Sequence, residues 1–80
     1  MPTVGTKVPE RWVPTHRTNN RTLYHDMMGE TWYFAELGII RAIYPDNHAG
    51  RNAVTVALIK GVEEANGVFA RQLERIEKAA

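Results

Sequence analysis

Acidic and imidazole side chains between residues 25 and 36 are the first candidates for chemistry in this sequence. Asp26 and Glu30 are four residues apart, which places two carboxylates on one face of a helix. Two such pairs meeting across a dimer axis could hold a divalent cation. His25 is adjacent to Asp26, and it would point about 100° away around the same helix. A small helical enzyme or metal-binding protein is therefore one alternative, and an ordinary solvated acidic face is the other interpretation of these residues.

Nucleophilic catalysis finds little support in the composition. The chain contains no cysteine and no serine, so it lacks the two commonest side-chain nucleophiles. Its six glycines are scattered and form no phosphate-binding loop. We therefore assign no catalytic residue, no metal ligand and no cofactor from the sequence.

Basic side chains concentrate in the first 21 residues. This segment has four basic residues against one glutamate, a net charge of +3, whereas the remainder of the chain carries −2. A flexible basic segment that also carries Trp12 has the composition expected for neutralising phosphates and stacking a base. Nucleic-acid association is therefore an alternative function, with the candidate contacts Lys7, Arg11, Arg17 and Arg21.

The same segment also has the composition of a protein-binding arm. Three of the four prolines lie within it, and proline favours extended backbone over helix. Val4, Val8 and Trp12 recur about every four residues, and tryptophan and arginine are enriched at interface hot spots. We favour this interpretation, in which the arm clasps a neighbouring subunit through Trp12.

Two long helices are the elements expected to follow the arm. Apolar residues recur at steps of three and four from residue 22 to 44, on more than one side of the expected helix. A turn rich in Pro, Asp, Asn and Gly covers residues 44–51, and Asn52 could cap a second helix that runs nearly to the C-terminus. The expected fold is all-α: an extended arm over residues 1–21 and an antiparallel helical hairpin over residues 22–80.

Burial between these two helices is expected to involve one stripe from each. The first stripe is Tyr24, Met28, Trp32, Ala35 and Ile39, and the second is Val54, Leu58, Val62, Ala65, Phe69, Leu73 and Ile76. A chain of 80 residues without disulfides has a marginal core, and the first helix has apolar groups left uncovered. Oligomerisation or docking on a larger protein would cover them.

The sequence thus predicts a non-enzymatic small subunit that mediates protein–protein assembly. An accessory subunit of an enzyme, an assembly or virion-associated protein and an inhibitory subunit would all fit. The expected partner is a second copy of the chain or a larger protein complex, and the expected interface residues are Val4, Val8, Trp12, Arg17, Tyr24, Met28, Trp32 and Ile39.

No membrane segment is expected. The first twenty residues have no apolar core of the kind found in signal peptides. The longest apolar window, residues 32–44, contains a glutamate and an arginine and is too short to span a bilayer. We expect a soluble, cytoplasmic protein.

Overall fold

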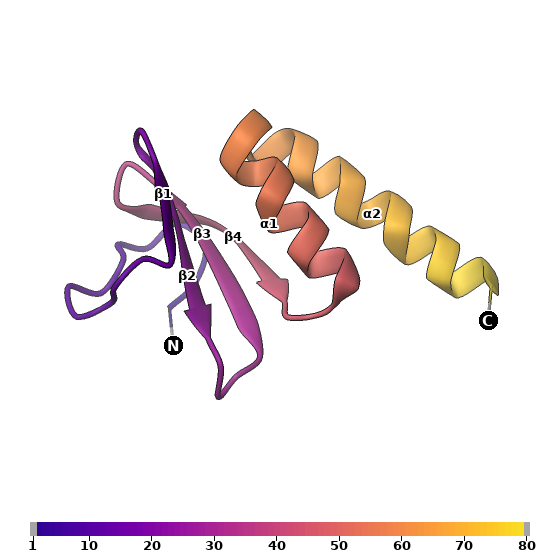
Figure 1. Cartoon of the computed structure of the whole chain (residues 1–80), viewed down its shortest axis with the longest axis horizontal. Coiled ribbons are helices and arrows are strands. Elements are labelled where there is room, and N and C mark those ends of the chain that lie inside the picture. Colours follow the sequence, from indigo (N-terminus) through magenta and orange to yellow (C-terminus); the bar gives the residue numbers. More distant parts are fainter. Residues whose placement is uncertain (1, 80) are drawn as a thin grey trace.

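The fold is α+β, with an antiparallel sheet followed by two helices (Figure 1). A computed structural model describes residues 2–79, with side chains as far as residue 75. The four strands pair in chain order as a meander, β1-β2-β3-β4. The elements are β1 (His16–Thr18), β2 (Arg21–Asp26), β3 (Thr31–Glu36), β4 (Ile39–Pro45), α1 (His48–Lys60) and α2 (Val62–Ala79).

The predicted all-α helical hairpin is wrong, because residues 22–44 form strands rather than a helix. Tight turns interrupt this segment. Leu37 and Gly38 both have positive φ, 54° and 78°, as a two-residue hairpin turn of type I′ requires. Side chains along each strand alternate between the two faces of the sheet, so the predicted stripe from Tyr24 to Ile39 does not exist as one surface.

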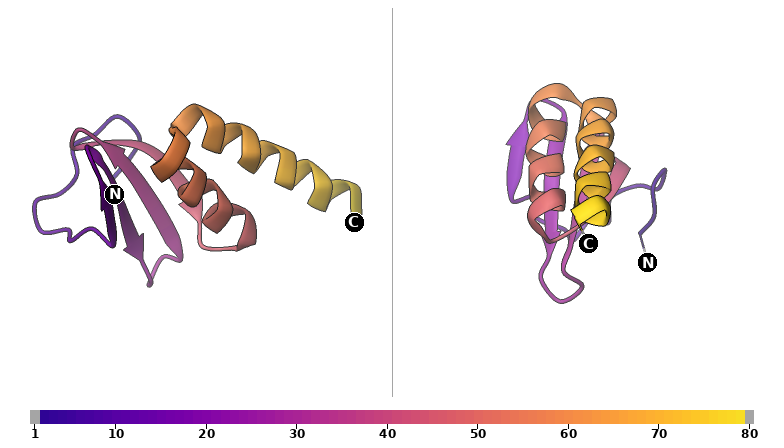
Figure 2. Two further views of the ribbon diagram at one scale, coloured as in Figure 1. Left: turned by 45° about the horizontal axis from the view of Figure 1, so that its top comes forward. Right: turned by 90° about the vertical axis from the view of Figure 1, so that its right-hand side faces the viewer.

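The predicted second helix is divided into two. It begins earlier than expected, because Asn47 is the N-cap and its Oδ1 accepts a hydrogen bond from the Gly50 N–H at 2.8 Å. It ends at Gly61, whose φ of 105° only glycine adopts readily and whose N–H donates to the Ala57 carbonyl. The chain then reverses, and α2 runs back alongside α1 (Figure 2).

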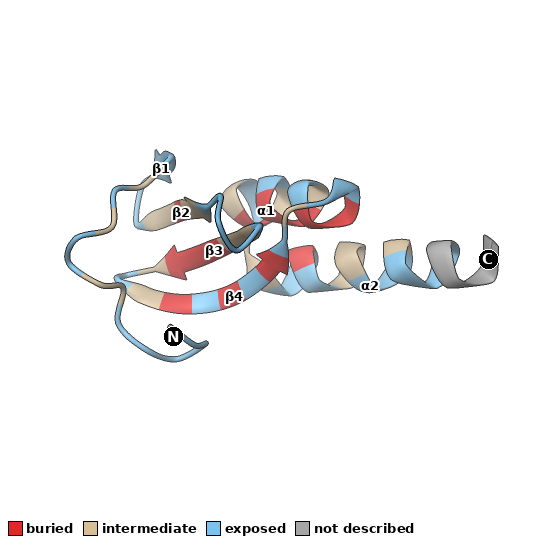
Figure 3. Cartoon of the chain, turned by 90° about the horizontal axis from the view of Figure 1, so that it is seen from below, coloured by how far each residue is buried: buried red, intermediate tan, exposed pale blue. Residues whose placement is uncertain are grey.

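The main core lies between the sheet and α1 (Figure 3). Leu23 of β2, Phe34 of β3 and Ala42 of β4 are cross-strand neighbours on the face toward the helices. Small side chains on the helices let them approach this face closely. The helix residues buried here are Ala53, Val54, Ala57 and Ala65.

The N-terminal arm packs on its own sheet, on the side away from the helices (Figure 1). Backbone hydrogen bonds run from the Gly5 N–H to the Ile40 carbonyl and from the Ile40 N–H to the Thr6 carbonyl, at 2.8 and 2.9 Å. The arm thereby pairs with the first part of β4. Tyr33 and Ala35, which alternate with Phe34 along β3, are buried on this second face.

Candidate functional site

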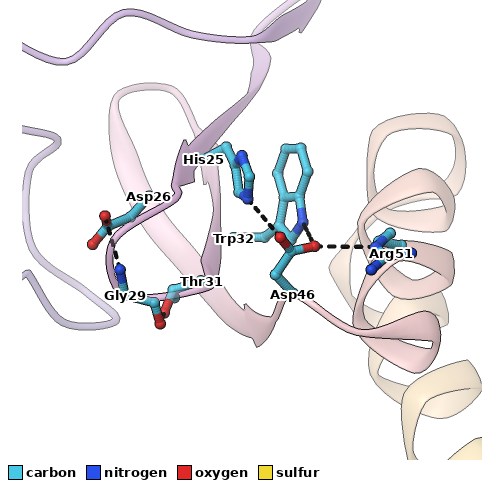
Figure 4. Close-up of polar contacts among 7 residues, drawn as sticks. All are labelled: His25, Asp26, Gly29, Thr31, Trp32, Asp46 and Arg51. Carbon is cyan, nitrogen blue, oxygen red and sulfur yellow. Dashed lines mark hydrogen bonds and ion pairs between the residues drawn. The ribbon is translucent and has the colours of Figure 1, made fainter.

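The loop between β2 and β3 has a well-defined backbone. The Asp26 carboxylate accepts a hydrogen bond from the Gly29 N–H at 3.1 Å, and the Thr31 hydroxyl donates to the Gly29 carbonyl at 2.8 Å (Figure 4). The Glu30 N–H donates to the Met27 carbonyl, and Glu30 has a φ of 51°. These bonds within six residues fix the shape of the loop and leave little conformational entropy to lose on binding.

Two methionines stand at the end of this hairpin. Met27 is 79% exposed and Met28 is 96% exposed. The loop that carries them projects beyond the rest of the sheet and beyond both helices (Figure 2). We call Met27 and Met28 the Met tip. Flexible, polarisable thioethers on a projecting loop are suited to entering an apolar pocket.

The base of this hairpin is braced by one carboxylate, that of Asp46 (Figure 4). Its Oδ1 accepts from the Trp32 indole N–H at 3.0 Å and from Arg51 Nε at 3.1 Å, and its Oδ2 lies 2.9 Å from His25 Nε2. The Asp46 N–H also donates to the Glu30 carbonyl at 2.8 Å. The His25 and Trp32 rings stack, with centroids 4.2 Å apart. One residue therefore connects β2, β3 and α1 directly beneath the Met tip.

Hydrogen bonds to its charged form hold the pKa of Asp46 at about 2, below its ordinary value of 3.8. The Trp32 indole has the largest effect, followed by Arg51 and His25. A carboxylate with a lowered pKa in the folded state stabilises the fold above its unfolded-state pKa, and this contribution is lost as the pH falls. We therefore expect the stability of the chain to decrease between about pH 4 and pH 2.

An Asp46→Asn variant tests this contribution. Asparagine keeps an acceptor for the indole but carries no charge, so the variant should unfold at lower urea concentration at pH 6 and depend less on pH below 4. Urea unfolding at pH 6, 4, 3 and 2.5 measures both effects. Glu64→Gln, on the exposed side of α2, is the control and should retain the wild-type pH dependence. Parallel loss of stability in the wild type and Asp46→Asn would contradict the assignment.

A pocket of about 410 Å³ lies between the arm and β2, beside the Met tip. Trp12 packs over two tyrosines of the sheet, with ring centroids 5.5 Å from Tyr24 and 4.8 Å from Tyr33. We call this cavity the arm pocket. Its lining residues are Arg11, Trp12, Val13, Tyr24, His25, Asp26 and Tyr33.

The predicted interface residues are spread over several surfaces. Trp12 and Tyr24 meet at the arm pocket, and Met28 lies just beyond them at the end of the hairpin. Trp32 instead packs beside the core on the helix side of the sheet. The others are Val4, exposed in the arm, Val8, half-buried in the arm, Arg17, exposed on β1, and Ile39, half-buried at the start of β4.

The residues predicted to contact nucleic acid do not form one surface either. Arg21 Nε contacts Glu36 at 3.3 Å, and its Nη1 donates to the Leu58 carbonyl at 3.2 Å, so this guanidinium joins β2 to β3 and α1. The other three basic side chains are exposed on separate parts of the chain. The backbone of Lys7 pairs with that of Ile39 in β4 as an isolated β-bridge. Arg11 lines the arm pocket, and Arg17 lies on β1.

The sequence does not predict the contacts of Asp46 at the base of the hairpin, and of the Met tip it singles out only Met28. The sequence indicates only a turn around Asp46, it does not single out Met27, and it does not predict the Asp46–Arg51 contact. The only local signal for a hairpin here was Gly29 between two β-prone segments.

The two carboxylates considered for the alternative of a metal site have other neighbours in the structure. Asp26 caps the Gly29 N–H, and Glu30 is exposed on the same loop. Among the side chains that the structure describes, those of residues 2–75, no group of three or more His, Asp or Glu is arranged to hold a metal ion. Within residues 2–79, no helix has the length and apolar character needed to cross a membrane. No protein-family model, curated protein sequence or solved structure matches this chain.

Proposed function

We propose that this protein is a non-enzymatic subunit of a protein assembly and that it docks through the Met tip. The observation that carries the proposal is the combination of exposure and order at this loop. Met27 and Met28 are 79% and 96% exposed, yet the loop backbone is internally hydrogen-bonded and its base is braced by Asp46. A preordered loop backbone loses little entropy on binding, which favours docking.

The burial of both methionines would supply a substantial part of a binding energy. Moving a methionine side chain from water to an apolar pocket contributes about 1.5–3 kcal/mol. Asp26 and Glu30 flank the tip with negative charge, which disfavours a phosphate backbone as the surface it meets. A protein pocket with an apolar interior and a basic rim is the complementary surface.

The double variant Met27→Ser/Met28→Ser tests the proposal. Expressed at native level in its own cells, the wild-type chain should migrate in a complex larger than 9.1 kDa, and the double variant should shift to the monomer position. Sedimentation of cleared extracts in a density gradient measures the shift. The loop gains no buried polar group, so the fold should be retained by circular dichroism.

Leu37→Ser is the matched control, since Leu37 is 75% exposed at the β3–β4 turn. This variant should remain in the larger complex. Migration of the wild-type chain as a monomer, or unchanged migration of the methionine variant, would contradict docking through the Met tip.

A further inference from the structure

We infer that the arm pocket binds a small zwitterion of the aromatic amino-acid class, which carries an ammonium group and a carboxylate on an aromatic body. This site is separate from docking through the Met tip, and the proposed function gives its residues no role. The pocket volume of about 410 Å³ lies within the range of about 300–1,000 Å³ that is usual for small-molecule sites. Its lining combines an aromatic wall with one charged group of each sign.

The wall of the pocket consists of three aromatic rings from three parts of the chain. Tyr24 of β2 and Tyr33 of β3 are cross-strand neighbours, and Trp12 of the arm packs over both of them. Tyr33 is buried, whereas Trp12 and Tyr24 are half-buried and keep part of their surface accessible. Aromatic rings pack well against a further ring, and their faces attract an ammonium group. The wall therefore favours a ligand with an aromatic body.

Two ionic groups of opposite sign line the same pocket. Arg11 lies in the arm, and Asp26 is the last residue of β2. Among the side chains of residues 2–75, the ion pairs join other residues and include neither Arg11 nor Asp26. A simple anion would be repelled by Asp26, and a simple cation would be repelled by Arg11. A ligand that carries both charges satisfies both groups.

The Asp26 carboxylate is held on the pocket side of the sheet. Side chains alternate along β2, so Tyr24 and Asp26 face the arm, and Figure 4 shows His25 and Asp26 pointing to opposite sides of the strand. His25 Nε2 contacts Asp46 on that opposite side, so the imidazole adds no third charge to the pocket. Asp26 accepts one hydrogen bond from the Gly29 N–H at 3.1 Å, and a carboxylate has further acceptor capacity for an ammonium group.

Four ligands test this chemistry on the unmodified chain. L-Phenylalanine has all three groups, whereas 2-phenylethylamine lacks the carboxylate, 3-phenylpropionate lacks the ammonium group, and L-alanine lacks the ring. L-Phenylalanine should bind saturably, with a dissociation constant of about 1 mM or lower. Each of the other three ligands should bind at least about threefold more weakly, because each loses one of the contacts.

Proton–nitrogen correlation spectra of the full chain measure this binding and locate it. The Trp12 indole N–H and the Gly29 N–H, which donates to Asp26, should shift on titration with L-phenylalanine. The Trp32 indole N–H donates to Asp46 on the other face of the sheet. It is the internal control and should not shift.

Two variants assign the charges. Asp26→Asn keeps an acceptor for the Gly29 N–H, and it should weaken binding of L-phenylalanine and 2-phenylethylamine at least about threefold without weakening 3-phenylpropionate. Arg11→Gln should weaken binding of L-phenylalanine and 3-phenylpropionate without weakening 2-phenylethylamine. Glu30→Gln is the matched control, because Glu30 is exposed on the same loop as Gly29 but does not line the pocket. It should retain wild-type binding of all three ligands.

Each outcome decides the matter. Saturable binding of L-phenylalanine that shifts both reporters and responds to the two variants in this ligand-specific way supports the inference. No shift with L-phenylalanine up to about 10 mM overturns it, as does equally tight binding of either singly charged ligand. A variant pattern that is the same for all three ligands also overturns it. These spectra are recorded on the isolated chain, so their result is independent of the larger complex expected in cell extracts.

Discussion

Replacing Phe34 by alanine is expected to remove about 3–5 kcal/mol of folding free energy. Phe34 is completely buried, and its cross-strand neighbours are Leu23 and Ala42. Its ring also belongs to the cluster formed with the α1 residues Ala53 and Ala57, which are too small to fill the space it would leave. A chain of 80 residues has a total stability of about 4–12 kcal/mol, so the variant would lose at least about a quarter of it.

Urea unfolding followed by circular dichroism and tryptophan fluorescence measures this loss. Met28→Ala is the control, since Met28 is 96% exposed and its removal should change stability by less than about 0.5 kcal/mol. Equal effects of the two substitutions would contradict a core built on β3. The comparison also separates the observed sheet from a helical arrangement, in which Met28 would lie on the main buried stripe and Phe34 would not.

The fold was mispredicted in residues 22–44 because two periodicities overlap there. Apolar residues are so frequent in this segment that residues three and four positions apart are often both apolar, as they would be on one face of a helix, although the segment forms strands. The alternation in β4 was the better signal: Ile40, Ala42 and Tyr44 are buried, whereas Arg41 and Ile43 between them are exposed. Aromatic and β-branched residues also favour strands.

Turn chemistry would have resolved the ambiguity between helix and strands. Leu37-Gly38 separates β3 from β4 by two residues, and Asn19-Asn20 separates β1 from β2 in the same way. Both are hairpin positions, and Asn19 has a φ of 52°. A single helix over residues 22–44 leaves no place for these turns.

The C-terminal region was easier to predict, because its apolar residues recur with helical spacing almost without interruption. Buried or half-buried residues of the predicted stripe include Val54, Leu58, Ala65 and Phe69. Leu73 is 38% exposed, and Ile76 lies outside the residues whose burial is described. The start at Asn47 instead of Asn52 was missed, and so was the reversal at Gly61, where one positive φ turns one expected helix into two.

The candidate site could be anticipated by residue type but not by geometry. Trp12, Tyr24 and Met28 were selected as interface residues from their chemistry, and two of the three line the arm pocket. The brace at Asp46 could not be found, because its partners come from β2, β3 and α1 and meet only in the folded chain. Long-range polar contacts of this kind leave no periodic trace in a sequence.

Replacing Gly50 by alanine should be as disruptive as the loss of Phe34. A Cβ at Gly50 would lie 1.8 Å from the Pro45 carbonyl oxygen and 2.9 Å from its carbon, and both are backbone atoms that cannot rotate away. The end of β4 or the first turn of α1 would have to move. Overpacking of this severity is expected to cost about 3 kcal/mol or more.

The displacement should also reach the Met tip. Asp46 follows Pro45 directly, and its carboxylate and N–H hold the base of the hairpin. Gly50→Ala should therefore loosen the loop before the whole chain unfolds, and hydrogen exchange should be faster at the Asp46 and Gly29 amides than in the wild type. Unchanged exchange at these amides together with wild-type stability would contradict the close approach of α1 to β4.

Gly67→Ala is the matched control within a helix. The added Cβ would meet only the flexible Arg71 side chain, at 3.6 Å, and alanine is the better helix former. This variant should gain about 0.5–1 kcal/mol and leave exchange at the Met tip unchanged. Opposite signs from the same substitution at two helical glycines would show that the close contact with Pro45, rather than glycine itself, is what α1 requires to hold Asp46 beneath the tip.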